Sequence, residues 1–404
     1  MKNKKQKALI RPRHKIVENL IRTFFLPYAK RRYNIEIEKF NGENRPYLIL
    51  SNHQTAYDQF FIGEAIDGMI YYVASEDIFS LGFISKVINY LIAPIPIKKQ
   101  VTDVKAVLHC NRISKAGGTI ALFPEGNRTY SGKTEYINPA IAGLVKLLKL
   151  PIAFFRIEGG YGVHPRWADD VRKGSKMRAY VSKVMEVEEY SSLDNNALYE
   201  IIKKELFVDD TTIESENYHK NLAESVERAI YICPNCGITA FKSKRNFFKC
   251  NTCNLLVEYL PNKKLKGASE DISFEYLKDW YDYQSNYVNN LDLQTFEDKE
   301  ICKDIKVKLF KVVLYKKKKL LNKKASITLY NDKIVINNKG NMVLPLDEIS
   351  AVTVLGKNKL NVYHKDSVYQ IKGDRSFNAI KYVNIYHHYK NLKEGNENGG
   401  FLGL

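Results

Sequence analysis

The stretch YLILSNHQTAYDQFFIGEAI, residues 47–66, decides the fold class, because an apolar strand runs into a polar turn and then into a helical pattern. The same alternation returns in residues 69–75, 119–126, 137–150 and 151–161. Strands that alternate with helices predict an α/β domain, a mixed sheet flanked by helices. We place this domain at residues 36–230.

The length and charge of the chain limit its possible domain organisation and partners. Its 404 residues suit two or three domains, and 63 Lys and Arg against 45 Asp and Glu give a formal charge of +18. Such a balance predicts a polyanionic partner, and nucleic acid and an anionic lipid surface both fit it. Residues 1–15 are basic but lack the apolar run of a secretory signal, so we expect the chain to stay in the cytoplasm.

Residues 1–35 predict a basic amphipathic helix. Its apolar stripe consists of Ile16, Val17, Leu20, Ile21, Phe24, Phe25 and Tyr28. Cations flank the stripe at Lys15, Arg22, Lys30, Arg31 and Arg32. Such a helix either lies in a lipid headgroup layer or packs on its own domain. Residues 78–97 approach the length of a membrane span but contain Lys86, Asn89 and two prolines, so we interpret them as a core or interfacial segment.

His53 and Asp58 form the first candidate site. The strand ends directly before His53, which places its imidazole at the carboxyl edge of the sheet, where α/β proteins build their sites. The two residues meet only if a turn intervenes; with Thr55 as the helix cap, Asp58 occupies the third position and folds back. An imidazole oriented by a carboxylate is a competent general base, although Thr-x-x-Asp is also an ordinary capping pattern.

A second stretch, FPEGNR at residues 123–128, also follows a strand and ends in a polar turn, with Glu125 placed 72 positions after His53. With both motifs in this order, the sequence resembles the glycerolipid acyltransferases typified by 1-acylglycerol-3-phosphate acyltransferase. That family is recognised by N-H-x-x-x-x-D followed by F-P-E-G-x-R. The resemblance covers residues 40–190.

The resemblance implies that His53 deprotonates the acceptor hydroxyl and that Asp58 holds His53. It also implies that Glu125, Gly126 and Arg128 help to bind the phosphate end of the acceptor. The residue types agree, because acyl transfer from a thioester needs an activated alkoxide, and Arg128 offers a planar fork that matches phosphate. The chain has no G-x-S-x-G nucleophile motif.

Three departures from the family pattern leave the acceptor open. The block at residues 95–99 reads IPIKK, with Lys99 where arginine is usual; Lys99 keeps a cation for phosphate but loses the bidentate geometry. Residues 150–154 carry one proline where two are usual. Asn127 stands where threonine is commoner.

Four cysteines predict a metal site. Cys233 and Cys236 form one C-x-x-C pair, Cys250 and Cys253 form another, and 13 residues separate the pairs. This is zinc-ribbon spacing, in which two knuckles point four thiolates at one tetrahedral ion. Four protein ligands leave no open position, so we expect a structural Zn²⁺ in a ribbon at residues 231–262, and the pattern favours a reducing compartment.

The remaining chain changes character. Residues 263–300 predict a helical linker, with one helix capped by Ser273. Residues 301–392 contain short strands separated by turns and then a helical run at residues 376–389, which resembles a mostly antiparallel pleckstrin-homology-like (PH-like) domain. The run Lys316–Lys319 is either a solvated loop or a contact for anionic headgroups.

We therefore expect an O-acyltransferase of phospholipid biosynthesis at the cytoplasmic face of a membrane, peripheral or monotopic. It would use acyl-CoA or acyl-acyl carrier protein to acylate 1-acylglycerol-3-phosphate, forming phosphatidic acid; another lysophospholipid or an amphipathic alcohol is the alternative acceptor. A zinc-ribbon protein that binds nucleic acid or regulates is the non-enzymatic alternative. Nucleic acid is disfavoured because the basic residues are not interleaved with aromatic ones on a recognisable reader.

Overall fold

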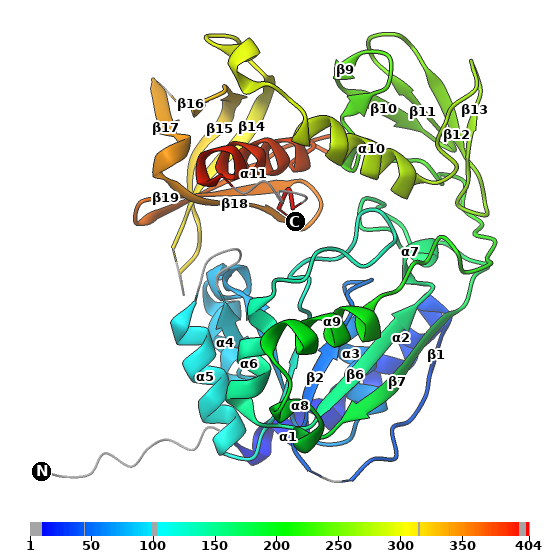
Figure 1. The fold of residues 1–404 in the computed structure, drawn as a ribbon, viewed down its shortest axis with the longest axis vertical. Helices are drawn as coiled ribbons and strands as arrows, with labels where there is room; N and C mark the ends of the chain where they lie inside the picture. Colours follow the sequence, from blue (N-terminus) through cyan, green and yellow to red (C-terminus); the bar gives the residue numbers. More distant parts are fainter. Residues whose placement is uncertain are drawn as a thin grey trace, which may run out of the picture.

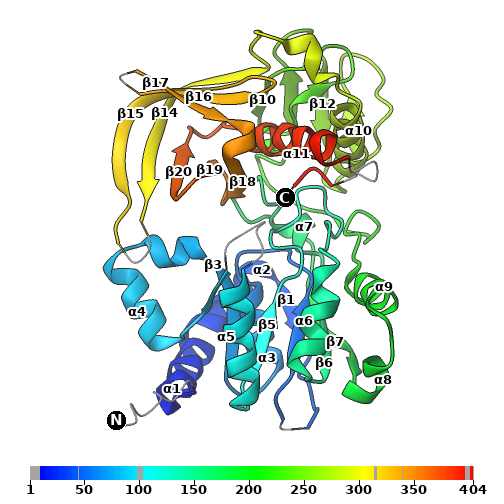
Figure 2. The ribbon, with the colours of Figure 1, turned by 60° about the vertical axis from the view of Figure 1, so that its left-hand side comes forward.

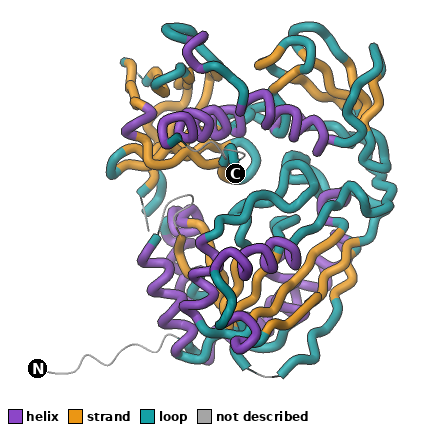
Figure 3. Tube along the Cα trace, viewed as in Figure 1, coloured by secondary structure: helices purple, strands orange, loops and turns teal. Residues whose placement is uncertain are grey.

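A computed structural model of the chain describes residues 10–43, 45–97, 103–313, 316–338, 340–395 and 401–403. These residues form an N-terminal α/β unit, a small β unit that carries the cysteines, and a large antiparallel sheet (Figure 1). Helices surround the N-terminal sheet, whereas strands dominate the C-terminal units (Figure 3). The predicted α/β fold and the antiparallel C-terminal sheet are confirmed.

The described part of the N-terminal unit is built on a mixed sheet in the order β1-β7-β6-β2-β5-β3-β4. Its strands are β1 (Ile35–Ile37), β2 (Leu48–Ser51), β3 (Ile70–Ser75), β4 (Ile95–Ile97), β5 (Thr119–Leu122), β6 (Ile152–Glu158) and β7 (Met177–Met185). β2 pairs in parallel with β5 and β6, so that Leu50 lies opposite Leu122 and Phe154. β7 runs antiparallel to β6. The carboxyl ends of β2, β5 and β6 therefore meet at one edge.

Helices cover both faces of this sheet. On one face lie α5 (Val104–Lys115), α6 (Ala140–Leu148) and α9 (Asn195–Leu206); on the other lie α2 (Leu26–Tyr33) and α3 (Asp58–Ala65). Leu48 and Leu50 pack in the first layer and Ile49 in the second, as the alternation of side chains along a strand requires. The unit also contains the short helices α7 (Gly160–Val163) and α8 (Val187–Ser191).

The N-terminal segment is helical over residues 12–33, and it contains a π-helical turn. It is divided into α1 (Pro12–Leu20), a π-helical turn η1 (Ile21–Phe25) and α2. The extra residue per turn shifts the helical register, so Leu26, Ala29 and Tyr33 enter the core. Several members of the predicted stripe stay exposed, and Phe24 keeps 75% of its surface.

Residues 78–97 are likewise divided, among the end of a 3₁₀ turn η2 (Glu76–Ser80), α4 (Phe83–Leu91) and β4. Ile95 is buried, but α4 exposes 78% of Phe83. None of the helices in the described residues is both long enough and apolar enough to cross a bilayer.

The cysteine unit has two small antiparallel sheets. One pairs β8 (Ile232–Cys233) with β9 (Gly237–Ile238); the other orders β10 (Phe241–Lys244), β11 (Phe247–Cys250), β12 (Leu256–Tyr259) and β13 (Leu265–Gly267). Helix α10 (Leu277–Asn289) packs beside them through Trp280, whose Nε1 donates to the Ile232 carbonyl at 2.8 Å. The N-cap of α10 is Tyr276, so the prediction of a Ser273 cap was wrong: the chain bends at Ser273 and Glu275 and becomes helical only after Tyr276. The Asp279 carboxylate accepts the Tyr276 amide at 2.8 Å.

The C-terminal sheet has the order β17-β16-β15-β14-β20-β19-β18 among the described residues. Its elements are β14 (Cys302–Val312), β15 (Lys319–Leu329), β16 (Lys333–Asn337), β17 (Asn341–Pro345), β18 (Ile349–Leu355), β19 (Lys359–His364), β20 (Ser367–Lys372) and the closing helix α11 (Ile380–Glu394). The β14–β15 hairpin reaches down to the start of α4 (Figure 2), where Lys317 forms an antiparallel bridge with Leu81.

Candidate active site

The site begins where β2 ends. Asn52 directly follows β2. It donates from Nδ2 to the Ile157 carbonyl and accepts the Ile157 amide at Oδ1, each at 2.8 Å. This two-point bond holds the β2 turn against β6. Gly160, which starts α7, packs so closely that an added Cβ would lie 2.6 Å from the Gln54 Cβ. The turn that carries His53 is thus held by β6, through Asn52, and by the start of α7, through the close contact of Gly160.

The structure brings His53 and Asp58 together. His53 Nδ1 lies 2.8 Å from Asp58 Oδ2, and the Asp58 side chain is fully buried while 20% of the His53 side chain is exposed. The amides of Gln54 and Thr55 also donate to this carboxylate, at 2.7 and 2.9 Å, and the Thr55 hydroxyl donates at 2.6 Å. These four donors hold the Asp58 side chain in one position as a hydrogen-bond acceptor.

The predicted capping geometry was wrong in detail. Asp58 is the first residue of α3 and Tyr57 precedes it at the N-cap, so Thr55 lies in the turn and does not cap the helix. The Thr55 hydroxyl is bonded to the Asp58 carboxylate instead. Asp58 therefore receives its donors from the turn that precedes α3, and this is how it reaches His53 only five positions away.

The second motif lies beside the first. The Phe123 ring stacks on the His53 ring, with centroids 4.2 Å apart and planes 19° from parallel. The Thr129 amide donates to the His53 carbonyl at 3.2 Å. The loop after β5 therefore fixes both the plane and the backbone of the histidine.

Glu125 joins three segments of the site. Its Oε1 accepts the His53 amide and its Oε2 accepts the Glu135 amide, both at 2.7 Å. The side chain is buried, and burial raises its pKa well above the ordinary value, against the lowering effect of these amides. Both carboxylate oxygens accept hydrogen bonds from backbone amides, so in this geometry Glu125 positions His53.

Gly126 adopts φ of 66°, the left-handed region that favours glycine, and its amide donates to the Phe123 carbonyl at 2.9 Å. The Gly126 amide is thus used in closing the turn.

Arg128 follows in the same loop and is half-buried. Burial lowers the pKa of Arg128 to about 10, with the Arg166 charge as the next cause. No carboxylate lies within ion-pair distance of Arg128 among the residues that the structure describes. Lys99, the other cation predicted for the acceptor, lies outside the described residues.

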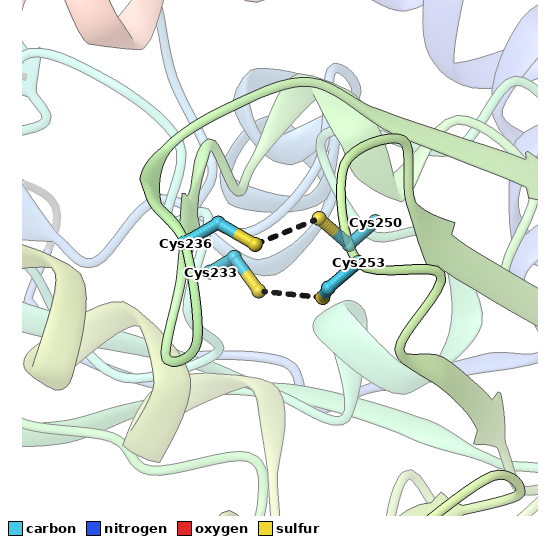
Figure 4. A group of neighbouring side chains, drawn as sticks. All are labelled: Cys233, Cys236, Cys250 and Cys253. Atoms are coloured by element: carbon cyan, nitrogen blue, oxygen red, sulfur yellow. Dashed lines mark hydrogen bonds between the residues drawn. The ribbon is translucent and has the colours of Figure 1, made fainter.

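The four predicted metal ligands converge. The Sγ atoms of Cys233, Cys236, Cys250 and Cys253 all lie within 4.8 Å of one another (Figure 4). Cys233 and Cys253 are 3.6 Å apart, and Cys236 and Cys250 are 4.0 Å apart. Four thiolates around a tetrahedral ion at 2.3 Å would be spaced by about 3.8 Å, so the cluster can hold a metal ion.

Sequence reasoning missed three residues of this site. Asn52 lay inside the first motif but received no role, and Glu135 gave no signal because its contribution is a backbone amide. Arg166 donates from Nη1 to the Arg128 carbonyl at 2.8 Å. It follows β6 in a glycine-rich turn, GGYGVHPRW at residues 159–167, and a polar turn after a strand at the same sheet edge was the available signal.

Comparison with known proteins finds one family whose model matches part of this chain. Residues 31–157 match the family model described as Acyltransferase. The crystal structure of the 1-acyl-sn-glycerophosphate acyltransferase PlsC from Thermotoga maritima is similar with a TM-score of 0.39 and 19% identity, covering 49% of this chain and 81% of that chain. No curated protein gives a significant match. The family match supports an O-acyltransferase in lipid metabolism, and it contains both His53 and Arg128.

Proposed function

We propose that this protein transfers a fatty acyl group from a thioester to the free hydroxyl of a lysophospholipid, with 1-acylglycerol-3-phosphate as the favoured acceptor and phosphatidic acid as the product. The observation that carries the proposal is the 2.8 Å contact between His53 and a buried Asp58 beside the FPEGNR loop, within the segment that matches the acyltransferase family. Another lysophospholipid or an amphipathic alcohol is the alternative acceptor.

The proposed chemistry needs one proton acceptor. With Nδ1 bonded to Asp58, His53 takes the acceptor's hydroxyl proton at Nε2, and Asp58 stabilises the imidazolium that forms. The alkoxide oxygen bonds to the thioester carbonyl carbon, and the tetrahedral intermediate collapses by breaking the carbon–sulfur bond. The imidazolium then returns its proton to the departing thiolate. The thiol belongs to coenzyme A or to acyl carrier protein.

In this scheme Arg128 binds the acceptor phosphate, and Lys99 would supply a further cation. The contacts of Glu125 support a positioning role, because its carboxylate fixes the backbone of His53. An assay of purified protein against a panel of lyso-acceptors, read by lipid mass spectrometry, tests the proposal. Acylation of lysophosphatidate above the other acceptors is expected, and no acylated product from any acceptor would contradict the proposal.

We propose that the protein works at an anionic membrane surface on its cytoplasmic side. Phe24 of η1 and Phe83 of α4 are 75% and 78% exposed. Helix α1, which runs into η1, contacts α4, because the Arg13 guanidinium lies 3.7 Å from the centre of the Tyr90 ring. The bridge at Lys317 places the lysine-rich end of β15 next to this apolar face. Exposed aromatics with nearby cations are what an interfacial protein presents to lipid.

Co-sedimentation with vesicles tests this surface. Changing Phe24 and Phe83 together to Ser should abolish binding to anionic vesicles, whereas Leu392→Ser, on the exposed side of α11, should leave binding unchanged. Equal binding by both variants would contradict the proposed face.

We propose that the cysteine cluster holds a structural Zn²⁺. The two C-x-x-C knuckles come from different hairpins, so the ion would join them and contribute to the folding of the unit. We further propose that residues 301–392 are a PH-like domain, because an antiparallel meander closed by α11 is the arrangement expected of one. An experimental structure in which α11 does not close this sheet would contradict the second proposal.

A further inference from the structure

Beside Arg128 lies a group of buried donors without acceptors. Arg128 Nη1, Arg166 Nε and His164 Nε2 are all buried and have no hydrogen-bond partner among the described residues. Only 3% of Arg166 and 8% of His164 is exposed. A buried donor left unpaired destabilises a folded protein, so several of them together indicate that a ligand binds there.

The three residues belong to one cluster. Arg166 donates to the Arg128 carbonyl at 2.8 Å and from Nη2 to Asn127 Oδ1 at 3.2 Å. Tyr33 Oη lies 2.9 Å from His164 Nδ1. Burial, and next the charge of Arg128, lower the pKa of His164 to about 3, so its imidazole is neutral. In the tautomer in which the Tyr33 hydroxyl donates to Nδ1, His164 Nε2 carries the proton and is a donor without an acceptor.

The charges of this cluster are not balanced within the protein. No carboxylate lies within ion-pair distance of Arg166 or Arg128 in the described ranges. The Tyr130 ring, 4.2 Å from the Arg166 guanidinium, offsets part of the desolvation but leaves Nε without an acceptor. The Arg166 guanidinium is buried and Arg128, a half-buried neighbour, buries its Nη1. Two such cations without a counter-charge favour a dianion over a monoanion.

We propose that Arg166, together with Arg128, binds the phosphate of the acceptor and makes the site selective for a phosphomonoester. The inference rests on the proposed function and deepens it by naming a specificity residue outside the segment that matches the family. A phosphomonoester offers three terminal oxygens and up to two charges, whereas a phosphodiester offers two oxygens and one charge. The three unused donors match the former, and His164 supplies the uncharged one.

The C-terminal sheet helps to position Arg166. Lys357, in the turn between β18 and β19, donates to the Ala168 carbonyl and lies 3.4 Å from Asp169 Oδ1. Arg228 donates to the Trp167 carbonyl at 2.8 Å. These two cations hold the three residues that directly follow Arg166. Lys357 is therefore a positioning residue of the acceptor site, contributed by a different unit of the chain.

Calorimetric titration of the full chain with glycerol 3-phosphate tests the anion site without requiring turnover. We expect Arg166→Gln to weaken binding about 10- to 100-fold, the effect of losing a hydrogen bond to a charged group, and Arg166→Lys to fall between Gln and wild type. The matched control is Arg178→Gln, an exposed arginine paired with Glu38, which should bind as wild type does. Glycerophosphocholine, a phosphodiester, should bind wild type more weakly than glycerol 3-phosphate does. Its affinity should also differ less between wild type and the Arg166 variants.

Kinetics then separate this inference from the proposed function. In the acyl-transfer assay Arg166→Gln and Lys357→Gln should raise the KM for lysophosphatidate with kcat within threefold, and Lys365→Gln, paired with Glu348 at the surface, should change neither. If wild type acylates lysophosphatidate but Arg166→Gln and Arg166→Lys keep the wild-type KM and glycerol 3-phosphate affinity, the inference is wrong and the function stands. If no acceptor is acylated but glycerol 3-phosphate binding depends on Arg166, the anion site stands without the function.

Discussion

Changing Asp58 to Asn is the most informative perturbation of the catalytic pair, because the side chain keeps its shape but loses its charge. Oδ2 accepts from His53 and from the Gln54 amide, and Oδ1 accepts from the Thr55 hydroxyl. If the new NH₂ group takes the place of Oδ2, it faces donors and forces the proton of His53 onto Nε2. If it takes the place of Oδ1, the tautomer of His53 survives but the imidazolium loses its counter-charge.

Both orientations slow the reaction. An ion pair at ~4 Å and an effective dielectric constant of ~20 is worth about 4 kcal/mol, and we reduce this to about 3–4 kcal/mol because His53 is partly exposed. Each 1.36 kcal/mol changes a rate about tenfold, so kcat should fall about 10²–10³-fold. Thr55→Val is the control, since it removes one donor to the same carboxylate without changing the charge, and it should slow kcat less than about 10-fold.

The assay follows thiol release from the acyl donor at saturating acceptor, with circular dichroism to show that each variant is folded. A folded Asp58→Asn protein with kcat within threefold of wild type would show that His53 does not need a carboxylate partner.

Three further predictions concern other parts of the molecule. Arg128→Ala should raise the KM for lysophosphatidate about 10- to 100-fold and affect a phosphodiester lyso-acceptor less; equal losses would show that Arg128 does not bind the phosphate. Elemental analysis of wild type should find about one zinc per chain, and Cys250→Ser should remove it. Wild type should release the metal as pH falls, because protons compete for the thiolates. If wild-type protein purified without chelator contains no zinc, the proposed site is wrong. Asp169→Asn should destabilise the chain at pH 7 by about 1–2 kcal/mol. Burial alone would raise the pKa of Asp169, but the nearby cations Arg228, Lys357 and Arg375 outweigh it and lower the pKa from 3.8 to about 2. Asp169 therefore stabilises the folded chain above pH 3.8 and loses this effect as pH falls toward 2, so urea midpoints of variant and wild type should differ at pH 7 and converge near pH 2; a constant difference would contradict the ion-pair explanation.

The sequence was informative wherever a short-range pattern decides the structure. The apolar run before His53 is buried on both faces of a parallel sheet, so its strand and the polar turn after it were readable from residue types alone. The two C-x-x-C pairs were readable for a similar reason, because each knuckle is closed by neighbouring residues.

Contacts between distant segments were not readable. The N-terminal apolar stripe indicated a helix, but the π-helical turn inside it could not be predicted from the local sequence pattern. This turn accompanies the packing of Tyr33 on Tyr57 and Phe61. Glu125 looked like a ligand for the acceptor, and its role in fixing His53 depends on an amide 72 positions away. Arg166 was missed because its importance lies in the absence of a counter-charge, which only the folded arrangement reveals.

The central claim is that His53 is the base for acylation of lysophosphatidate, and one measurement tests it most directly. Purified wild type and His53→Ala are each incubated with lysophosphatidate and with acyl-CoA or acyl-acyl carrier protein, and phosphatidate is quantified by mass spectrometry. We expect wild type to form phosphatidate with at least one donor and folded His53→Ala to form it ~10²–10⁴-fold more slowly, the usual contribution of a general base. Phosphatidate formation by His53→Ala at the wild-type rate, or none by wild type with either donor, would contradict the central claim.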